Sequence, residues 1–409
     1  MKKVLAVLIA ATLSCCAFFG CGDNDSKPEN TDSSSAASSS EPIDISKGAT
    51  EAMLERSILS EGDSSRIAEK LANVERKPKE ITKICFMGDS ITQGSAASSS
   101  VTQYTAQFQK WWEENMSYYV EFVNAGIGAT DSYLGVHRVQ EHVLDNQPDI
   151  IFIEFINDVD NDFYKASMDS LVRKCLAQQN NPAVILVEMT MDNGTCPQNV
   201  HSEIAGAYGV PVISYHDAVM PEIEAGTLKW ADISPDNIHP NDAGHTMLAQ
   251  MLINYIEVTK GKLDTLETTS KTFDAHSPTG DKYANARMAD RNSEEIKVID
   301  EGSFTEVASF QRFNNGWSTE KGGSITFEME FKNLGLAYMK TTDGLSGTVS
   351  VSVDGDDLMP ISGDFPDGWG DYAKTDEIYT SEETAKHTVT VTVLDGDAQN
   401  FQILTWLLS

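Results

Sequence analysis

Ser90 and His239 are the residues of this sequence whose surroundings best fit nucleophilic catalysis. Ser90 lies in the segment Gly-Asp-Ser-Ile-Thr-Gln-Gly (88–94), directly after an apolar run that is typical of a buried strand. A serine hydroxyl is a poor nucleophile unless a base lies within hydrogen-bond distance. His239 can be that base, because Asp236 precedes it in an Asp-x-x-His arrangement that lets the carboxylate orient the imidazole ring. We therefore predict Ser90 as nucleophile, His239 as general base and acid, and Asp236 as the orienting carboxylate.

Two further segments offer groups that stabilise the oxyanion formed when a serine attacks a carbonyl. The segment Asn-Ala-Gly-Ile-Gly-Ala-Thr follows the second apolar run and offers main-chain N–H groups. In it we assign Gly128 as the donor and keep Ala129 as an equal alternative. After the third run, Asn157 offers a side-chain amide, and the main-chain N–H of Ser90 can face the same oxygen. A second Asn-Asp pair follows at 161–162, and we prefer Asn157 because it lies next to the predicted strand.

These segments stand at the ends of predicted strands, in a region where strand-like and helix-like patterns alternate. Apolar runs of strand length occur at 81–87, 119–123, 150–156, 183–189 and 210–214, and helical patterns occur at 49–73, 104–115, 134–144, 164–178, 198–208 and 242–255. Apolar runs that are buried on both faces predict a parallel sheet covered by helices on both sides. In such sheets, ligands bind at the carboxyl ends of the strands, where the candidate residues stand.

Four short motifs occur in a set order along the chain: Gly-Asp-Ser at 88–90, Asn-Ala-Gly-Ile-Gly at 124–128, Asn-Asp at 157–158 and Asp-x-x-His at 236–239. In these motifs, roughly residues 50–260 resemble the SGNH hydrolases, also called GDSL esterases. The resemblance implies a flavodoxin-like three-layer α/β/α fold and a Ser-His-Asp esterase mechanism without metal or cofactor. It also implies oxyanion roles for the Ser90 N–H, the loop after Asn124 and the Asn157 amide.

The sequence departs from the family pattern at two positions. Phe155 stands where the third motif usually has a glycine. Ala129 stands where the donor glycine of the second motif most often falls, with Gly128 one residue earlier. A main-chain N–H serves whichever residue carries it, so the second departure affects only the assignment of the donor.

The sequence changes character after Lys262. Residues 263–302 are polar and mixed, and we predict that they form a linker. From 303 to 409, alternating strands at 324–331, 347–353 and 387–394 are separated by Asp-Gly turn signals, which predicts a β-sandwich accessory domain. Aromatic residues of this domain are candidates for stacking on sugar rings: Trp317, Trp369, Tyr372 and Trp406.

The N-terminal residues predict export and lipid anchoring. Met-Lys-Lys is followed by an apolar run at 4–13 that is too short to span a bilayer, as in a secretory signal peptide. Phe-Phe-Gly-Cys at 18–21 resembles a bacterial lipobox, which implies cleavage before Cys21 and acylation of its thiol, with Cys15 as a weaker alternative. We predict a signal peptide with lipobox at 1–21, a disordered Ser- and Asp-rich linker at 22–45 and the hydrolase domain at 46–262. The expected location is the extracellular face of a bacterial membrane, reached only through the lipid anchor.

A formal net charge of −32 repels nucleic acid and anionic membrane surfaces, so we expect neither as a ligand. The sequence has no Cys-x-x-Cys pair and no Cys/His cluster, so we predict no metal site and no disulfide framework. The histidines other than His239, including His201, lack a partner like Asp236 and are predicted to be surface or structural residues.

The catalytic motifs, the export signal and the accessory domain predict an extracellular serine esterase that removes O-acetyl or other short acyl groups from polysaccharide. An acetylated glycan is therefore the expected partner. Two alternatives stay open: an esterase that acts on acetylated bacterial cell-wall glycan, and an inactive surface lipoprotein of the same fold that binds glycan. The intact Ser90, Asp236 and His239 favour an enzyme over the second alternative.

Overall fold

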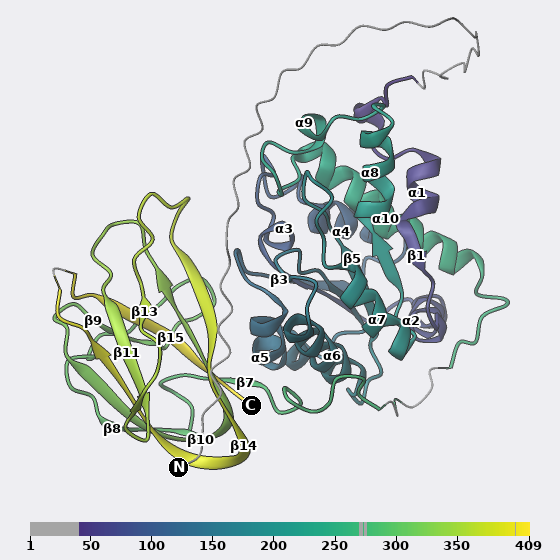
Figure 1. The fold of residues 1–409 in the computed structure, drawn as a ribbon. Helices are drawn as coiled ribbons and strands as arrows, with labels where there is room; N and C mark the ends of the chain where they lie inside the picture. The colour runs from purple at the N-terminus through teal and green to yellow at the C-terminus, as the bar shows by residue number, and fades with distance from the viewer. Residues whose placement is uncertain (1–40, 270–272, 274–275, 397) are drawn as a thin grey trace, which may run out of the picture. The chain divides into compact units, whose positions relative to one another are not determined.

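The computed structural model describes residues 41–269, 273, 276–396 and 398–409, and it contains two β-sheets of different type (Figure 1). The predicted signal peptide at 1–21, the predicted acylation site Cys21 and positions 22–40 of the predicted linker lie outside the described residues. Within positions 41–45 of that linker, the Ile43 N–H donates to the Thr227 carbonyl (2.9 Å), and the 3-10 helix η1 (Ile45–Lys47) begins. The chain therefore joins the fold at Ile43, before the end of the predicted linker.

The first sheet has the strand order β1-β6-β5-β4-β2-β3. Its parallel strands are β2 (Thr82–Gly88), β3 (Val120–Gly126), β4 (Ile150–Ile153), β5 (Ala183–Glu188) and β6 (Val212–Ser214). In β4, β5 and β6 every residue is buried, as expected for strands with helices on both faces. The short strand β1 (Ile58–Ser60) adds an antiparallel edge to β6. It interrupts the helix predicted for 49–73. The sequence does not show this strand, because three residues are too few for a recognisable strand period.

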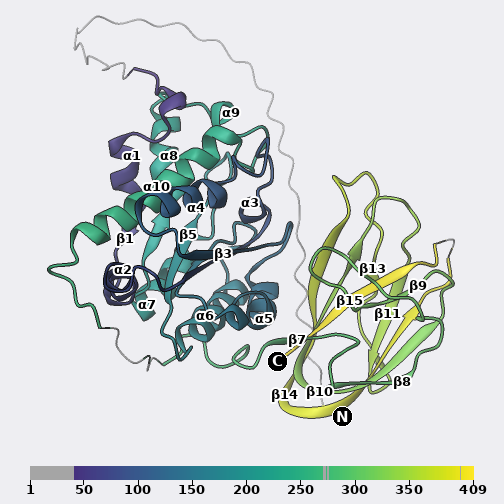
Figure 2. The same ribbon diagram turned by 180° about the vertical axis from the view of Figure 1, so that it is seen from behind.

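Helices cover both faces of this sheet (Figures 1 and 2). One face packs against residues of α5 (Ser132–His142), α6 (Asp162–Leu176) and α7 (Gln198–Tyr208). The other face packs mainly against α1 (Glu51–Ser57), α2 (Ser65–Arg76), α4 (Tyr104–Asn115), α8 (Tyr215–Glu224) and α10 (Asp242–Gly261). The short helices are α3 (Ser90–Gln93), α9 (Trp230–Ile233) and the 3-10 helix η2 (Leu144–Asn146). These layers confirm the predicted flavodoxin-like three-layer α/β/α fold.

The second sheet is antiparallel in all its strand pairs and forms a β-sandwich-like unit, which confirms the predicted accessory fold. Its strands are β7 (Arg287–Ala289), β8 (Ile296–Asp300), β9 (Trp317–Thr319), β10 (Ser324–Lys340), β11 (Thr348–Val353), β12 (Asp356–Asp357), β13 (Ile361–Ser362), β14 (Tyr372–Val393) and β15 (Phe401–Leu408). The long strands β10 and β14 pair with each other from Ser324↔Thr392 to Lys340↔Tyr372. Alternate residues of β10 and β11 point into a core that contains the edge-to-face rings of Trp317, Phe327 and Trp406.

The predicted linker at 263–302 contributes to this second sheet. Within it, β7 pairs with β15 and β8 pairs with β10. Both strands are short, and β8 is exposed along most of its length, so neither shows the alternation that marks a strand in the sequence. The β-sandwich-like unit thus begins before the predicted boundary at 303.

The α/β layers and the second sheet share buried side chains within residues 41–409. Tyr133 of α5 packs edge-to-face on Tyr283, with 5.5 Å between the ring centroids. A Cβ on Gly335 of β10 would lie only 2.1 Å from the Tyr133 hydroxyl, so this contact requires a glycine there. Leu407 of β15 belongs to the same buried cluster as Tyr133. The two units therefore contact each other through apolar packing as well as through the covalent chain.

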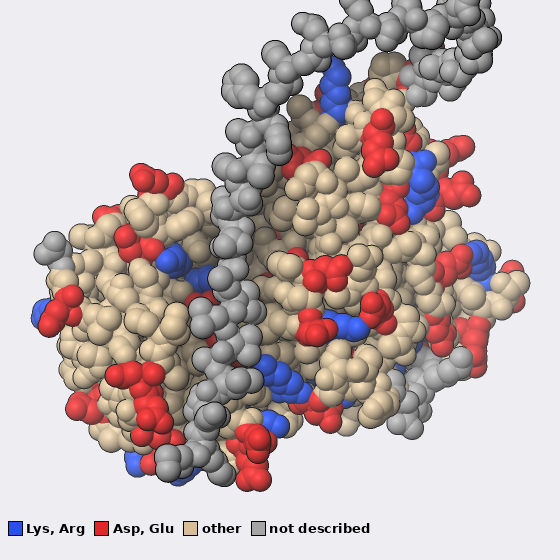
Figure 3. Space-filling model, in the orientation of Figure 1, with Lys and Arg blue, Asp and Glu red and all other residues tan. Residues whose placement is uncertain are grey.

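None of the helices in the described ranges combines the length and the apolar composition needed to cross a membrane. Asp and Glu side chains are spread over the face shown in Figure 3, with fewer Lys and Arg side chains among them. This distribution agrees with the formal net charge of −32.

Candidate active site

Ser90 lies at the carboxyl end of β2, as the first residue of α3. The strand ends at Gly88, where a Cβ would sit 2.1 Å from the Thr92 hydroxyl oxygen, so only glycine fits this tight turn. Asp89 caps the helix by accepting the Ile91 N–H on Oδ1 (3.0 Å). Ser90 itself is 8% exposed. Its main-chain N–H has no acceptor in the helix, since it belongs to the first turn.

His239 and Asp236 meet Ser90 from the loop before α10. His239 Nε2 lies 2.9 Å from Ser90 Oγ, and His239 Nδ1 lies 2.8 Å from Asp236 Oδ2. Asp236 Oδ1 also accepts the main-chain N–H groups of Ile238 (2.8 Å) and His239 (2.7 Å). The structure thus brings together the three side chains that the sequence analysis selected.

The surroundings of Asp236 favour its charged form. Partial burial works against ionisation, but the hydrogen bonds from the main chain and ring of His239 and from the Ile238 N–H lower the pKa of Asp236. A carboxylate at Nδ1 requires the proton of a neutral ring to be on that nitrogen. His239 Nε2 is then left as the acceptor for the Ser90 hydroxyl proton, which is the arrangement that activates a serine.

The loop around Gly128 lies beside Ser90. A Cβ built on Gly128 would be 3.8 Å from the Ser90 Cβ, and the Ile127 N–H donates to the Gly88 carbonyl (3.1 Å). Ala129 has a positive φ of 59°, which turns the backbone sharply at this point. Neither the Gly128 nor the Ala129 main-chain N–H has an acceptor among the described residues. Both predicted donors therefore stand in the loop next to the nucleophile, with free N–H groups.

Asn157 connects the Asp89 segment with the Gly128 loop. Its side-chain Nδ2 donates to Asp89 Oδ2 (2.9 Å) and to the Thr130 carbonyl (3.0 Å), and its main-chain N–H approaches the same Asp89 oxygen (3.3 Å). The amide predicted as an oxyanion donor is thus held by two acceptors. The second Asn-Asp pair has a different place, since Asn161 caps α6 by accepting the Tyr164 N–H (3.0 Å).

Phe155, the departure in the third motif, is an internal packing residue. It is 1% exposed, and a Cβ on Gly135 would lie 2.8 Å from its ring. The Arg138 guanidinium lies 5.9 Å from the centre of the same ring. The glycine usual in the third motif is thus replaced by an aromatic residue that α5 accommodates through its own glycine.

Sequence reasoning did not find the buried groups that support these loops. The Arg138 guanidinium donates to the carbonyls of Ala125 (2.6 Å) and Gly88 (2.8 Å), and burial lowers its pKa to about 9. Glu154 is 1% exposed and accepts from the Thr92 hydroxyl (2.8 Å). A charged residue in an amphipathic helix or at a strand end gives no sequence signal that separates such a contact from solvent exposure.

His201 is a structural residue of an unexpected kind. Its Nε2 lies 3.0 Å from Asp158 Oδ2, and its Nδ1 lies 3.0 Å from Glu188 Oε2. All three side chains are buried. Asp158 also accepts the Ser132 N–H at the start of α5 (2.8 Å), so this cluster fixes the residue that follows Asn157.

The aromatic residues proposed for sugar stacking divide into two groups. Trp317 and Trp406 are buried in the core of the second sheet. Trp369 is 70% exposed and lies on Tyr372, with 4.9 Å between the ring centroids and 31° between the planes. Phe365 packs edge-on against both rings. Of the four candidates for sugar stacking, Trp369 and Tyr372 are therefore the two that are open to a ligand.

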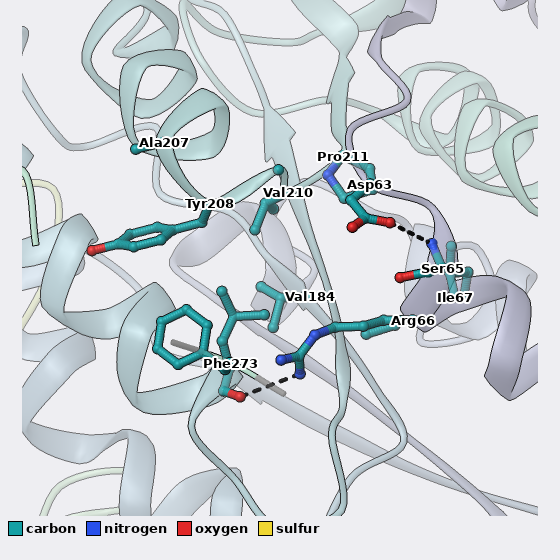
Figure 4. Close-up of a pocket in the computed structure, with 13 residues that line it drawn as sticks. Asp63, Ser65, Arg66, Ile67, Val184, Ala207, Tyr208, Val210, Pro211 and Phe273 are labelled. Atoms are coloured by element: carbon teal, nitrogen blue, oxygen red, sulfur yellow. Dashed lines mark hydrogen bonds between the residues drawn. The ribbon is translucent and has the colours of Figure 1, made fainter. Parts of the chain in front are cut away.

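A separate pocket opens at the amino ends of β5 and β6, at the sheet edge opposite to Ser90 (Figure 4). It encloses about 180 Å³, and its lining includes Arg66 and Tyr208. The Arg66 guanidinium donates to the main-chain carbonyls of Leu176 (3.2 Å) and Pro182 (3.3 Å), so it serves as a hydrogen-bond donor to the main chain of the fold. Over the residues that the structure describes, no three His, Cys, Asp or Glu side chains are arranged to hold a metal ion.

Comparisons with known proteins agree with this geometry. Residues 86–247 match the model of the GDSL-like Lipase/Acylhydrolase family, a span that includes every predicted residue of the site. The chain is similar to the crystal structure of a two-domain esterase active on acetylated mannans, with a TM-score of 0.78 and 30% identity over 87% of this chain and 98% of that chain. A second structure of such an esterase, co-crystallized with mannopentaose, gives a TM-score of 0.77 and 30% identity over 87% of this chain and 97% of that one. No curated protein sequence matches the chain significantly.

Proposed function

The chain belongs to the SGNH, or GDSL-like, acylhydrolase family, and from that premise we propose that it removes O-acetyl groups from polysaccharide by a Ser-His-Asp mechanism. The family and the similarity to a two-domain esterase make it a carboxylic ester hydrolase. The observation that carries the proposed mechanism is the hydrogen-bonded series from Ser90 Oγ to His239 Nε2 (2.9 Å) and from His239 Nδ1 to Asp236 Oδ2 (2.8 Å).

In the proposed mechanism, Ser90 Oγ attacks the acetyl carbonyl carbon while His239 Nε2 takes the hydroxyl proton. The imidazolium then gives this proton to the sugar oxygen, the ester bond breaks and an acetyl-enzyme remains. Water, deprotonated by His239, attacks the acetyl-enzyme, and acetate leaves as Ser90 regains its proton. Asp236 stabilises the imidazolium in both steps.

The negative oxygen of each tetrahedral intermediate is stabilised by hydrogen-bond donors around Ser90. We assign this role to the N–H groups of Ser90 and of Gly128 or Ala129, and to the Asn157 amide. Loss of one such donor typically lowers the rate about 100- to 1000-fold. The Asn157 amide can contribute to the oxyanion only by sharing a hydrogen with Asp89 or Thr130, or by releasing one of them.

A glycan substrate is supported by the similarity to esterases active on acetylated mannans and by the exposed Trp369–Tyr372 pair. Flat aromatic faces stack well on the apolar faces of sugar rings. Trp369→Ala is expected to lower acetate release from polymer while leaving hydrolysis of p-nitrophenyl acetate unchanged. Met359→Ala is the matched control, because Met359 is an 84% exposed apolar residue of the same unit without an aromatic face.

The test of the proposed function is acetate release by the full chain and by Ser90→Ala. The substrates are acetylated mannan, acetylated xylan and p-nitrophenyl acetate. Release from a polymer that disappears in Ser90→Ala supports a glycan acetylesterase. Release from p-nitrophenyl acetate alone directs the search to acetylated cell-wall glycan, and release from none of the three indicates a fold that only binds.

We also propose that the protein acts at the extracellular face of a bacterial membrane, anchored by a lipid on Cys21. The support is the apolar run at 4–13 followed by the lipobox-like Phe-Phe-Gly-Cys. Cells grown with a labelled fatty acid should label the wild-type protein and not Cys21→Ser. Equal labelling of the two proteins would reject this anchor, and Cys15→Ser provides the matched control.

A further inference from the structure

Two fully buried carboxyl groups, one next to Ser90 in the sequence and one at the end of β4, contact each other. Asp89 is 0% exposed, Glu154 is 1% exposed, and their side chains are hydrogen-bonded to one another. Burial, reinforced by the neighbouring Glu154, raises the pKa of Asp89 well above its usual range, and burial also raises the pKa of Glu154. Two carboxylates so close together repel each other, so ionisation of one raises the free-energy cost of ionising the other.

The Glu154 side of the pair is bonded to the segment that carries the nucleophile. Its Oε2 accepts the Thr92 hydroxyl proton (2.8 Å), and its Oε1 accepts the Ile156 N–H (2.9 Å). The Thr92 hydroxyl is also within 2.9 Å of the Tyr104 hydroxyl. The Glu154 N–H donates to the Met87 carbonyl, just before the Ser90 turn. Glu154 thus ties the end of β4 to α3.

The Asp89 side of the pair is bonded to the candidate oxyanion donor. Asp89 Oδ2 accepts the Asn157 side-chain amide (2.9 Å) and approaches its main-chain N–H (3.3 Å), while Oδ1 accepts the Ile91 N–H (3.0 Å). A reversed Asn157 amide would direct its own oxygen at an Asp89 oxygen. The orientation of this amide is therefore set by Asp89, and the position of Asp89 is set by Glu154.

We propose that Glu154 is a positioning residue of the esterase: through its bond to Asp89 it holds the Asn157 side chain beside the Gly128 loop, and through its bond to Thr92 it holds the first turn of α3, which carries the Ser90 N–H assigned as an oxyanion donor. This inference rests on the proposed function. Glu154 does not touch the reacting atoms, and it acts through its hydrogen bonds to Asp89, Thr92 and Ile156. What matters for this role is the shape and the hydrogen bonding of the Asp89–Glu154 pair.

Three substitutions of Glu154 separate this role from a general need for charge or for filled volume. In Glu154→Gln, the amide oxygen can accept the Ile156 N–H, and the amide N–H can donate to an Asp89 oxygen, so the connections to both neighbours are kept. In Glu154→Asp the carboxyl group is retained, but the side chain is one methylene shorter and cannot reach both sets of partners. In Glu154→Ala the bonds to Thr92 and Ile156 are lost, and Asp89 is left alone.

The experiment measures kcat and KM for p-nitrophenyl acetate with the full chain and these variants, together with urea unfolding to confirm that each is folded. Glu154→Ala and Glu154→Asp should lower kcat about 100-fold, the effect of one lost oxyanion donor. Their KM should stay within about threefold of wild type, because ground-state binding is not affected. Glu154→Gln should keep kcat within about tenfold of wild type, since the donor stays in place.

Asp169→Asn is the matched control. Asp169 is also fully buried and accepts hydrogen bonds from Ser277 Oγ (2.5 Å), the Tyr208 hydroxyl and Thr279, but it lies on α6, and within the described part of the chain none of its hydrogen bonds involves the Ser90 segment. It should lower stability and leave kcat unchanged. A kcat of folded Glu154→Ala equal to wild type would overturn the inference. So would a Glu154→Asp variant more active than Glu154→Gln, which remains decisive if Glu154→Ala does not fold. A wild-type protein without any Ser90-dependent activity would instead overturn the proposed function, and the inference with it.

Discussion

His239 and His201 are both hydrogen-bonded on both ring nitrogens, yet their surroundings are opposite. His239 lies between the Asp236 carboxylate and the Ser90 hydroxyl, and 26% of its side chain is exposed. His201 lies between the carboxylates of Glu188 and Asp158, with only 2% of its side chain exposed. Besides this difference in burial, the two centres differ in one hydrogen-bond partner, which is a hydroxyl for His239 and a second carboxylate for His201.

That one partner decides whether the ring can act as a base. A hydroxyl can give its proton to a neutral imidazole, so His239 keeps a free acceptor nitrogen. Two carboxylates require an N–H on each nitrogen, which makes the His201 ring a cation. Burial disfavours that cation, but Glu188 and Asp158 outweigh the burial and raise the pKa of His201 to about 10. A histidine with two acidic partners is therefore a fixed charge that holds a loop.

The largest expected effect is the loss of activity when His239 is replaced. His239→Gln keeps a polar side chain but removes the base, so kcat for p-nitrophenyl acetate should fall about 10⁴-fold, the upper range for a positioned general base. The free energy of unfolding should change by less than about 1 kcal/mol, because the ring is partly exposed. A variant that keeps more than a tenth of the wild-type kcat would show that another group takes the Ser90 proton.

The next largest effect is expected when His201 is replaced. This change should lower the stability of the fold and affect kcat much less. His201→Gln leaves Asp158 and Glu188 buried without a counter-ion, which should cost about 3–5 kcal/mol in the free energy of unfolding. The kcat of the folded fraction should fall far less than in His239→Gln, since Ser90 and its base are intact. Urea unfolding at neutral pH measures the first effect. An unfolding free energy equal to wild type would mean that the His201 ring carries no charge.

The same two histidines show which features can be predicted from the sequence, because His239 lies in a local motif and His201 does not. Ser90, Asp236 and His239 can be selected from the sequence because each stands in a local motif beside a strand or a helix, and the structure brings the three side chains together. The parallel sheet followed from apolar runs, and α4 and α7 begin and end at the predicted residues. Such features depend on neighbours along the chain, which a single sequence displays.

The features that the sequence did not predict depend on residues distant along the chain. His201 is 43 positions from Asp158, and Glu154 is 62 positions from Thr92, so no local pattern announces either contact. The short strands β7 and β8 form against the longer strands β15 and β10, and β1 forms against β6, so each depends on a partner strand that is distant along the chain. The orientation of the Asn157 amide toward Asp89 and Thr130 likewise exists only in the folded chain.

A smaller effect is the pH dependence of the stability that the charged His201 ring contributes. The unfolded pKa of a histidine is about 6.5, and the folded pKa of His201 is about 10. Because the folded pKa is the higher one, the stabilisation is fully present below about pH 6.5 and is lost as the pH rises toward the folded value. The difference in unfolding free energy between wild type and His201→Gln should therefore shrink from pH 6.5 to 10, by at most about 1.4 kcal/mol per pH unit. Urea titrations at several pH values test this, and a constant difference would contradict the buried imidazolium.

The smallest effect concerns a buried histidine without any acidic partner. His137 Nδ1 donates one hydrogen bond to the Tyr133 carbonyl (2.7 Å), and its Nε2 has no partner among the described residues. Burial lowers the pKa of His137 to about 3, so the ring is neutral. His137→Leu should cost only about 1 kcal/mol, the value of one hydrogen bond, and this cost should not change between pH 7 and 10. Urea unfolding of this variant beside His201→Gln isolates the effect of the two carboxylates from that of burial. If His137→Leu instead lost as much stability as His201→Gln, burial of any histidine would explain both results, and the charge at His201 would no longer be needed.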